Sequence, residues 1–477
     1  MANLKEKLCF PVFELIGQAA DEAALETYVV GGFVRDTVMK RPCKDIDIVT
    51  IGSGIQLAEK LQEKIGKGSK ISVFRNFGTA MLHFREKEED WQVEFVGARK
   101  ESYSHDSRKP VVEDGTLEDD QNRRDFTINA MAICLNQNRY GELTDPFDGC
   151  SDIKKQIIRT PLDPDITFSD DPLRMLRAIR FATQLDFSIH PDTFEAIKRN
   201  AYRIEIVSME RNIDEINKMM LSAHPSMGFR LLDKSGLLEI LFPELVKLKG
   251  TTSVGERTHK DNFKHTLEVL DNISKKSDDL FLRWAAVLHD IGKPYCKRYD
   301  EKTGFSFHGH ELKGSRMVKP IFRRLKLPLN EKMKYVEKLV SLHLRPIVLA
   351  EDIVTDSAVR RLIFDAGDDI DDLMLLCQAD ITSKNSYKVK QYMHNFEIVR
   401  QKMLEIEEKD RVRNFHPPVC GEEIMRIFDL APCKEIGVLK NAVKDAILDG
   451  IIPNDKQAAL DLLYSEAKKL GLKPHEQ

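Results

Sequence analysis

The sequence lacks the features that mark membrane and exported proteins. Its 477 residues contain no uninterrupted apolar run near the ~18 residues that a membrane-spanning helix requires. The broken apolar stretch near the N-terminus runs into Asp21 and Glu22 without a small-residue cleavage site, which argues against a signal peptide. We therefore expect a cytoplasmic protein with no membrane partner.

Cysteine pairs and repeats are also missing. The eight cysteines lie far apart and form no CxxC pair, so neither a zinc knuckle nor a redox pair is predicted. No internal repeat or low-complexity tract stands out. With 42% hydrophobic and 31% charged residues, the chain has the composition of a globular protein, long enough for about three domains.

The chain has no overall excess of positive charge. Its formal net charge of −4 argues, at face value, against a nucleic-acid partner. Residues 313–345 are an exception, because they hold ten Lys and Arg against two Glu. This stretch predicts a phosphate-contact surface, with Arg323, Arg324 and Lys326 as candidate RNA contacts. The alternative interpretation is an ordinary solvated helix face.

The hydrophobic pattern changes along the chain. Residues 45–50 predict a strand, and residues 80–84 and 91–96 predict a hairpin. The polar residues 102–121 predict a loop. From about residue 170 the periodicity is helical nearly to the end. The predicted fold class is therefore a multidomain protein with an N-terminal α/β head, built on a mixed or antiparallel sheet, followed by mostly α-helical parts.

A pair of carboxylates follows a glycine turn in the head. Asp45 and Asp47 are two residues apart, so on a strand their side chains point to one face, and Glu94 on a nearby strand can supply a third carboxylate. Such a set predicts Mg²⁺ binding. Upstream, the Gly31-Gly32 turn and Arg35 suit the phosphates of a nucleotide. The alternatives are a solvated strand face and a plain turn.

Three segments carry a family resemblance: Val30–Asp36, Lys44–Asp47 and Arg123–Ala132. Together they resemble the polymerase-β-type head of the class II CCA-adding tRNA nucleotidyltransferases and poly(A) polymerases. The resemblance implies a catalytic head over residues 1–160, in which Arg124 contacts the triphosphate.

The remaining domains are predicted from the same resemblance and from the helical pattern. We expect a helical neck that selects the nucleotide and binds RNA over residues 161–250, an HD domain over 251–400, and a helical tRNA-contacting region over 401–477.

The segment Asp170–Phe181 predicts a helix that carries regularly spaced charges. Asp170 or Asp171 suits the N-cap, with Pro172 in the first turn. A carboxylate beside a guanidinium matches the donor–acceptor order of cytosine and adenine and mismatches uracil and guanine. The resemblance implies that Asp171 and Arg174 read the base while Arg177 and Arg180 bind the nucleotide. The alternative is an ordinary capped amphipathic helix.

A histidine–aspartate pattern lies further along: His265, the pair His289-Asp290, and Asp380. Imidazole and carboxylate together suit Mn²⁺, Ni²⁺, Fe or Zn²⁺ better than Mg²⁺. The pattern resembles the HD-type metal-dependent phosphohydrolases, some of which act on phosphate esters or 2′,3′-cyclic phosphates. Further ligands are available among His308, His310 and His343, although each is equally explained as a surface or core histidine.

These observations predict template-independent, Mg²⁺-dependent addition of CCA to the 3′ end of tRNA from CTP and ATP, with release of pyrophosphate. The segment 99–117 resembles the flexible loop of full CCA enzymes, which favours addition of the final adenosine. The alternatives are a poly(A) polymerase, an A-adding enzyme, and an HD phosphohydrolase with an RNA-binding head. No obligate protein partner is inferred.

Overall fold

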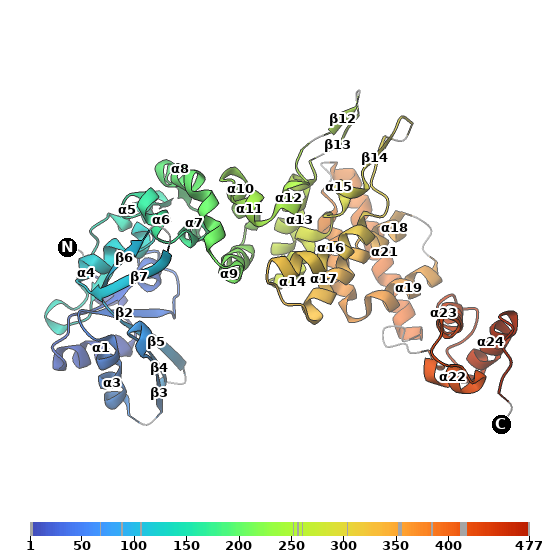
Figure 1. The fold of residues 1–477 in the computed structure, drawn as a ribbon, viewed down its shortest axis with the longest axis horizontal. Helices are drawn as coiled ribbons and strands as arrows, with labels where there is room; N and C mark the ends of the chain where they lie inside the picture. Colours follow the sequence, from blue (N-terminus) through green and yellow to red (C-terminus); the bar gives the residue numbers. More distant parts are fainter. Residues whose placement is uncertain are drawn as a thin grey trace. The chain divides into compact units, whose positions relative to one another are not determined.

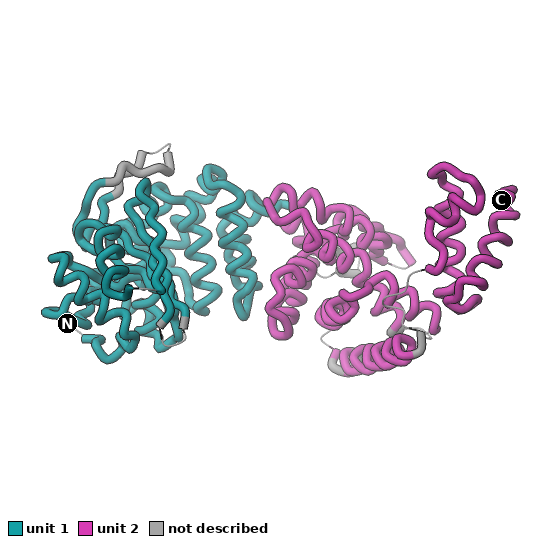
Figure 2. Tube along the Cα trace, turned by 90° about the horizontal axis from the view of Figure 1, so that it is seen from below, with its two compact units in different colours: residues 1–243 teal, residues 244–477 magenta. Residues whose placement is uncertain are grey.

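A computed structural model shows two compact units, Met1–Pro243 and Glu244–Gln477 (Figure 2). Each unit is described by itself. The structure describes the whole chain except residues 1–2, 67, 87–88, 105–106, 251, 255–256, 260, 303, 352–354, 383–384, 411–416 and 476–477. None of the helices in the described ranges is long and apolar enough to cross a membrane.

A seven-stranded sheet forms the centre of the first unit, with the strand order β3-β4-β5-β2-β1-β8-β9 (Figure 1). Strand β2 pairs in parallel with β5, and the other neighbours are antiparallel, so the predicted mixed sheet is confirmed. The predicted hairpin at residues 80–96 is the β4–β5 pair. The bounds are β1 Thr27–Val30, β2 Ile46–Thr50, β3 Ser69–Phe74, β4 Thr79–Glu86, β5 Glu89–Gly97, β8 Ala132–Cys134 and β9 Leu143–Thr144.

Alternation along β2 separates the core from the candidate site. Ile46 and Ile48 are fully buried, whereas Asp47 between them is only partly buried on the opposite face. Helix α3 (Gly54–Ile65) packs on the sheet, with α1 (Pro11–Glu22) against it. The sheet therefore fixes the backbone at Asp47 through its buried neighbours and leaves the carboxylate available.

The predicted loop at residues 102–121 is wrong for most of its length. Two antiparallel strands, β6 (Arg99–Ser104) and β7 (Ser107–Asp114), form a hairpin, and α4 (Leu117–Asn122) follows. Gly115 closes the base of this hairpin, because a Cβ there would lie 2.7 Å from the carbonyl carbon of Arg99. Backbone pairing therefore orders a segment whose polar composition predicted none.

Helices complete the first unit: α2 Gly32–Val38, α5 Gly149–Lys155, α6 Pro164–Asp170, α7 Leu173–Leu185, α8 Pro191–Asn200, α9 Met209–Met220, α10 Pro225–Lys234 and α11 Leu237–Leu241. Helix α7 packs against α9 and α10. A short parallel pair of strands, β10 (Ile157–Ile158) and β11 (Ser188–Ile189), links the segment before α6 to the segment after α7.

Helix α7 begins later than the sequence predicts. Asp170 is the last residue of α6, and Asp171 is extended (φ −138°, ψ 100°) because a residue before proline avoids the helical region. The side chain of Asp171 still accepts a hydrogen bond from the Leu173 amide, at 3.2 Å. The acidic residue therefore caps α7 from a position outside the helix.

The second unit is helical, with two short hairpins. Its core contains Trp284 and Phe322, whose rings are 6.4 Å apart, and the buried Leu288. The helices are α12 Pro243–Val246 (shared with the end of the first unit), α13 Asn262–Ser274, α14 Leu280–Leu288, α15 Lys293–Cys296, α16 His310–Arg324, α17 Glu331–Leu342, α18 Arg345–Glu351, α19 Asp356–Ala366, α20 Ile370–Asp380, α21 Ser386–Asp410, α22 Gly421–Phe428, α23 Lys434–Leu448 and α24 Lys456–Lys469. The hairpins are β12 (Thr252–Val254) with β13 (Arg257–His259) and β14 (Arg298–Asp300) with β15 (Gly304–Ser306).

Candidate nucleotide site and metal centre

The predicted carboxylates meet on neighbouring strands of the head. Asp47 on β2 lies directly beside Glu94 on β5 and opposite Val30 at the end of β1, and Asp45 immediately precedes β2. Burial raises the pKa of Asp47 to about 6, and the negative charges of Asp45 and Glu94 add to this shift. These carboxylates therefore repel one another, which a bound cation relieves, so the set fits Mg²⁺.

The glycine turn at Gly31 passes close to the carboxylate of Asp47. Its φ of +71° is unfavourable for other residues, and a Cβ there would lie 3.4 Å from Asp47 and 3.2 Å from the guanidinium of Arg124. Gly32 begins α2, so the amides of the turn lie next to both the carboxylate and the arginine. The structure thus places the predicted phosphate turn beside the predicted cation site.

Four of the five predicted nucleotide-binding arginines are bound to a carboxylate, and the fifth, Arg174, bonds backbone carbonyls. Arg35 binds Asp36 at 2.8 Å, Arg124 binds Asp120 at 2.8 Å, Arg177 binds Asp125 at 2.6 Å, and Arg180 binds Glu215 at 2.7 Å. Asp120, Asp125 and Glu215 are buried. Although burial opposes ionisation, the neighbouring arginines hold the pKa values of Asp120 and Asp125 below their ordinary value.

Phe181 links three of these arginines. The guanidinium carbons of Arg180, Arg35 and Arg177 lie 4.1, 5.1 and 5.5 Å from the centre of its ring. Arg35 also donates a hydrogen bond to the Asn129 side chain at 2.9 Å. One aromatic ring therefore brings α2 and α7 together, and the arginines are fixed before any ligand arrives.

Asp171 and Arg174 lie at the start of α7, one turn apart. Arg174 donates to the backbone carbonyl of Arg123 at 2.6 Å, and Asp171 lies 3.8 Å from Arg211. The proposed base-reading pair is therefore joined to the residue that precedes Arg124.

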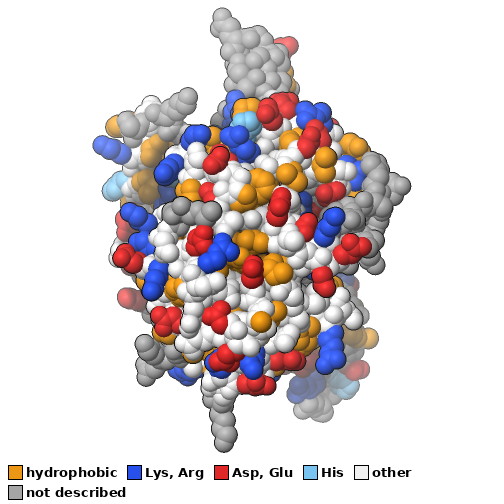
Figure 3. Space-filling view, turned by 90° about the vertical axis from the view of Figure 1, so that its left-hand side faces the viewer, with side chains coloured by type: hydrophobic (Ala, Val, Ile, Leu, Met, Phe, Trp, Pro, Cys, Tyr) orange, Lys and Arg blue, Asp and Glu red, His pale blue; other side chains and the backbone are white. Residues whose placement is uncertain are grey.

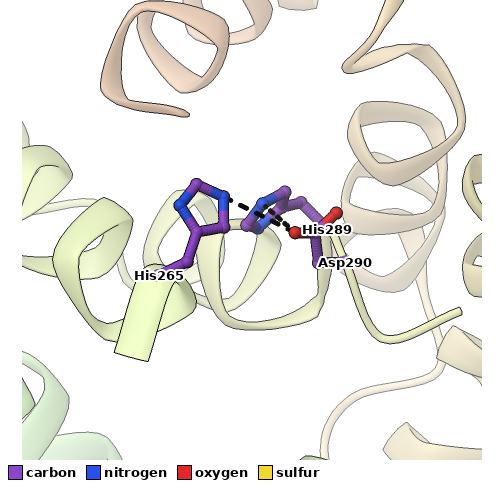
Figure 4. A group of neighbouring side chains, drawn as sticks. All are labelled: His265, His289 and Asp290. Carbon is purple, nitrogen blue, oxygen red and sulfur yellow. Dashed lines mark ion pairs between the residues drawn. The ribbon is translucent and has the colours of Figure 1, made fainter. Parts of the chain in front are cut away.

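The histidine–aspartate residues form a buried cluster in the second unit. His265 is on α13, the pair His289-Asp290 follows α14, and Asp380 ends α20. The Nε2 atom of His265 lies 2.8 Å from Asp380 and 3.5 Å from Asp290, and that of His289 lies 3.2 Å from Asp290. Figure 4 shows both rings pointing toward the Asp290 carboxylate. The structure thus brings all four predicted ligands together.

Two further histidines complete the cluster. His310, the first residue of α16, lies 3.2 Å from the other oxygen of Asp290, and His343, after α17, lies 4.0 Å from that same oxygen. Asp290 therefore belongs to two groups of metal-ligating atoms, one with His265 and His289 and one with His310 and His343. Sequence spacing did not decide whether His308, His310 or His343 is a ligand. The structure places His310 and His343 in the second group, whereas His308 is exposed and joins neither group.

Backbone carbonyls set the orientation of the rings. The Nδ1 atoms of His289, His310 and His343 lie 2.7–2.8 Å from the carbonyls of Ala286, Phe307 and Val340, each three residues earlier. Within the described ranges, the buried Nε2 atoms of the same three histidines have no hydrogen-bond partner. Nitrogens fixed in this way and aimed at a shared carboxylate fit a bound transition metal ion.

Protonation of the cluster follows burial and the nearby carboxylates. Burial lowers the pKa of His343 to about 4, so this imidazole is neutral at pH 7 and able to ligate. Burial acts in the same direction on His289, but Asp290 and Asp380 outweigh it and raise the pKa of His289 to about 10 in the metal-free protein. Metal binding there displaces a proton.

Comparison with known proteins gives three consecutive family matches. Residues 27–159 match the Poly A polymerase head domain, residues 186–248 the probable RNA- and SrmB-binding site of polymerase A, and residues 262–385 the HD domain. The chain is 33% identical to the A-adding tRNA nucleotidyltransferase of Deinococcus radiodurans, covering 72% of this chain and 78% of that protein. It is 32% identical to the multifunctional CCA protein of Shewanella frigidimarina, covering 77% and 86%.

The chain belongs to the class II family of CCA-adding tRNA nucleotidyltransferases and poly(A) polymerases. It is thus a nucleotidyltransferase with an HD domain. Solved structures show the same fold: the Thermotoga maritima CCA-adding enzyme complexed with tRNA (22% identity, TM-score 0.60, 98% and 99% of the two chains) and the Bacillus stearothermophilus CCA-adding enzyme with CTP (22%, 0.64, 97% and 99%).

Sequence reasoning missed the residues that hold the arginines of this nucleotidyltransferase. Asp125 lies inside a motif that was recognised, yet nothing in the motif shows that its partner is Arg177, which is 52 residues away. The basic stretch runs from α16 through α17 to the first residue of α18. Arg323 at the end of α16 and Lys326 after it are exposed, and Arg324 binds Glu244. Their role in RNA contact stays a prediction.

Replacing Asp47 with Asn is expected to stabilise the metal-free protein at pH 7.5. Because the pKa of Asp47 is about 6 in the folded protein, its ionisation above that pH lowers the free energy of unfolding. This loss disappears below pH about 4, the pKa of the group in the unfolded chain. Two pKa units correspond to at most about 3 kcal/mol. Thermal denaturation in EDTA measures the difference. A gain at pH 7.5 that vanishes near pH 4 is expected, and no change is expected for exposed Asp192→Asn. An unchanged or lower midpoint for Asp47→Asn at pH 7.5 contradicts the raised pKa of Asp47.

The shared Asp290 predicts two metal ions per chain. Equilibrium dialysis with Mn²⁺ or Ni²⁺ in excess Mg²⁺, which saturates the carboxylates of the head, is followed by metal analysis. It is expected to give two bound transition-metal ions in the natural protein and one in His343→Ala, which loses a ligand from the second group only. The exposed His308→Ala variant is the matched control and retains two. One ion in the natural protein, or two in a folded His343→Ala variant, contradicts the prediction.

Proposed function

We propose that this nucleotidyltransferase adds CCA to the 3′ end of tRNA from CTP and ATP without a nucleic-acid template. The observation that carries the proposal is the single constellation of Asp47, Glu94, the Gly31 turn and Arg124. Carboxylates for Mg²⁺ and donors for a triphosphate are the two requirements of nucleotidyl transfer. The relatives that share its domains are named as CCA-adding or A-adding enzymes.

Different residues of the head bind the metal ion and orient the triphosphate with its leaving group. Asp45 and Asp47, with Glu94 beside them, hold Mg²⁺, which supplies Lewis-acid stabilisation of the reacting oxygens when bound. The amides at Gly31 and Gly32 and the guanidinium of Arg124 orient the triphosphate and balance the charge of the departing pyrophosphate. Since Arg124 is fixed by Asp120, it does so without reorganising.

Selection of the base is assigned to the start of α7. The carboxylate of Asp171 accepts from the exocyclic amino group of cytosine or adenine, while Arg174 donates to the adjacent ring nitrogen. Uracil and guanine present the reverse order and leave both groups unsatisfied, which rejects them. Arg177 and Arg180, held by Asp125 and Glu215, bind the rest of the nucleotide.

The same site also suits an enzyme that adds only the final adenosine. The Deinococcus radiodurans relative, at 33% identity, carries that name. The β6–β7 hairpin lies in the segment that resembles the flexible loop of full CCA enzymes, which favours addition of the final adenosine and is compatible with both activities.

Addition assays separate the two activities. With tRNA that ends before CCA, the protein is expected to add two cytidines from CTP alone and then one adenosine when ATP is present, as read on sequencing gels. Asp47→Asn is expected to lose at least about a thousandfold in rate, because one of the Mg²⁺ ligands is gone, whereas Asp192→Asn keeps full activity. Addition of A only to tRNA already ending in CC identifies an A-adding enzyme, and long A-tails identify a poly(A) polymerase.

We further propose that the HD cluster hydrolyses phosphate esters with a bound transition metal such as Mn²⁺, Ni²⁺ or Fe. His265, His289, Asp290 and Asp380 offer ligands on one side, and His310 and His343 offer them on the other. Metal bound there supplies an activated water. Lys293, whose ammonium lies 2.6 Å from Asp290, provides a positive charge beside the place where a phosphate binds.

Hydrolysis of a 2′,3′-cyclic nucleotide tests this second activity. With Mn²⁺ or Ni²⁺ the natural protein is expected to release the monophosphate, and Asp290→Asn is expected to abolish release because both ligand groups lose their shared member. CCA addition by the same variant stays intact, which shows that it is folded, and His308→Ala keeps both activities. Absence of hydrolysis with every divalent metal makes the HD domain structural.

A further inference from the structure

A row of aromatic rings flanked by lysines begins beside the HD cluster. Tyr295 on α15 is 47% exposed and Tyr299 on β14 is 40% exposed, although large aromatic side chains are normally buried. These two tyrosines belong to a group that we call the aromatic–lysine strip, and all of its members lie in the second unit. Its members are Lys247, Lys293, Tyr295, Lys297, Tyr299, Phe305, Phe307 and Lys313.

The lysines of the strip lie on the rings. The ammonium groups of Lys247 and Lys313 are 5.3 and 5.4 Å from the centre of the Tyr295 ring, and Lys247 also hydrogen-bonds its hydroxyl at 3.1 Å. Lys297 is 5.1 Å from the ring of Phe305, which packs on Tyr299 at 5.0 Å across the β14–β15 hairpin. Lysines therefore accompany the exposed ring of Tyr295 directly and that of Tyr299 through the neighbouring ring of Phe305.

The strip is connected to the metal cluster at two points. Lys293 lies over the ring of Phe307 at 5.8 Å while its ammonium binds Asp290 at 2.6 Å. The carbonyl of Phe307 in turn bonds Nδ1 of His310. Lys313 is on the same helix as His310 and follows it by three residues, so both lie on one side of α16. Figure 1 shows that the hairpin of β14, which follows α15, projects from the helices of this unit.

We propose that the aromatic–lysine strip binds the single-stranded 3′ segment of an RNA and delivers its terminal phosphate ester to the HD cluster. Exposed rings stack on successive bases, and cations at the spacing seen here neutralise the phosphates between them. This proposal rests on the hydrolytic activity proposed above and names its substrate class: an RNA end rather than a free nucleotide.

The reaction at the delivered end is a hydrolysis. For a terminal 2′,3′-cyclic phosphate, the oxygen of water forms a bond to phosphorus, one ribose P–O bond breaks, and the departing ribose oxygen takes up the proton. The product is an RNA that ends in a phosphomonoester. Water is the only co-reactant, so the step needs neither oxidant nor reductant.

A comparison of two substrates tests the strip. With Mn²⁺ or Ni²⁺, the full-length Tyr295→Ala variant is expected to lose roughly tenfold or more in kcat/KM for a short oligoribonucleotide ending in a 2′,3′-cyclic phosphate, through a higher KM. Its kcat/KM for the cyclic mononucleotide stays within about twofold, because that substrate does not reach the strip. Tyr295→Phe retains the ring and is expected to restore KM. Tyr387→Ala, which removes another exposed tyrosine of the same unit (75% exposed), is the matched control and changes neither substrate.

Photo-crosslinking gives a readout that does not need hydrolysis. An oligoribonucleotide with 4-thiouridine near its 3′ end is expected to crosslink to the peptide covering residues 293–307. If crosslinking occurs there but no substrate is hydrolysed, the strip stands and the proposed hydrolytic function fails. If crosslinks form only elsewhere, or if Tyr295→Ala affects both substrates equally or neither, the RNA-binding proposal is overturned even where hydrolysis is confirmed.

Discussion

Pairing of buried carboxylates with basic side chains is the interaction on which the nucleotide site depends. Asp120 and Asp125 are almost completely buried, and an unpaired charge in such a position costs several kcal/mol. Each is ionised because an arginine binds it, and each fixes that arginine in return. The arginines proposed to bind the triphosphate are therefore held in place before any charge develops on a leaving group. Asp47 is the exception, because its neighbours include the carboxylates of Asp45 and Glu94. A cation bound from solution would relieve the repulsion between these carboxylates.

In the HD cluster, histidines rather than arginines surround the buried carboxylate. There the carboxylate of Asp290 is surrounded by imidazoles instead of guanidinium groups, and Lys293 supplies the permanent positive charge. Imidazole is a weaker partner for a carboxylate than arginine is, but it has a nitrogen lone pair that a metal ion can use. Because the backbone occupies Nδ1 of His289, His310 and His343, the only nitrogen left to each ring faces the carboxylate. The chain thus anchors the proposed phosphate-binding arginines with carboxylates and the candidate metal-ligating histidines with backbone carbonyls.

Patterns that are local in sequence predicted the fold and most site positions. Asp47 is placed by strand alternation, and the His289-Asp290 pair by the helix end that precedes it. Two local predictions were wrong. Strands β6 and β7 pair with each other although their composition is that of a loop, and Pro172 holds Asp171 extended, so α7 starts later than its charge pattern predicts. His310 and His343 could not be distinguished from His308 by spacing, since only packing of α16 and α17 shows which side chains are buried.

The absence of net positive charge now has a structural explanation. On the face shown in Figure 3, basic and acidic side chains are interspersed, and at the nucleotide site Arg35, Arg124, Arg177 and Arg180 are each accompanied by a carboxylate. An arginine that must be held in one position at a phosphate site requires an acidic partner behind it, so each one adds about zero to the net charge. A protein that binds nucleotides through fixed arginines can therefore be acidic overall. Net charge thus does not decide whether such a protein has a nucleic-acid substrate.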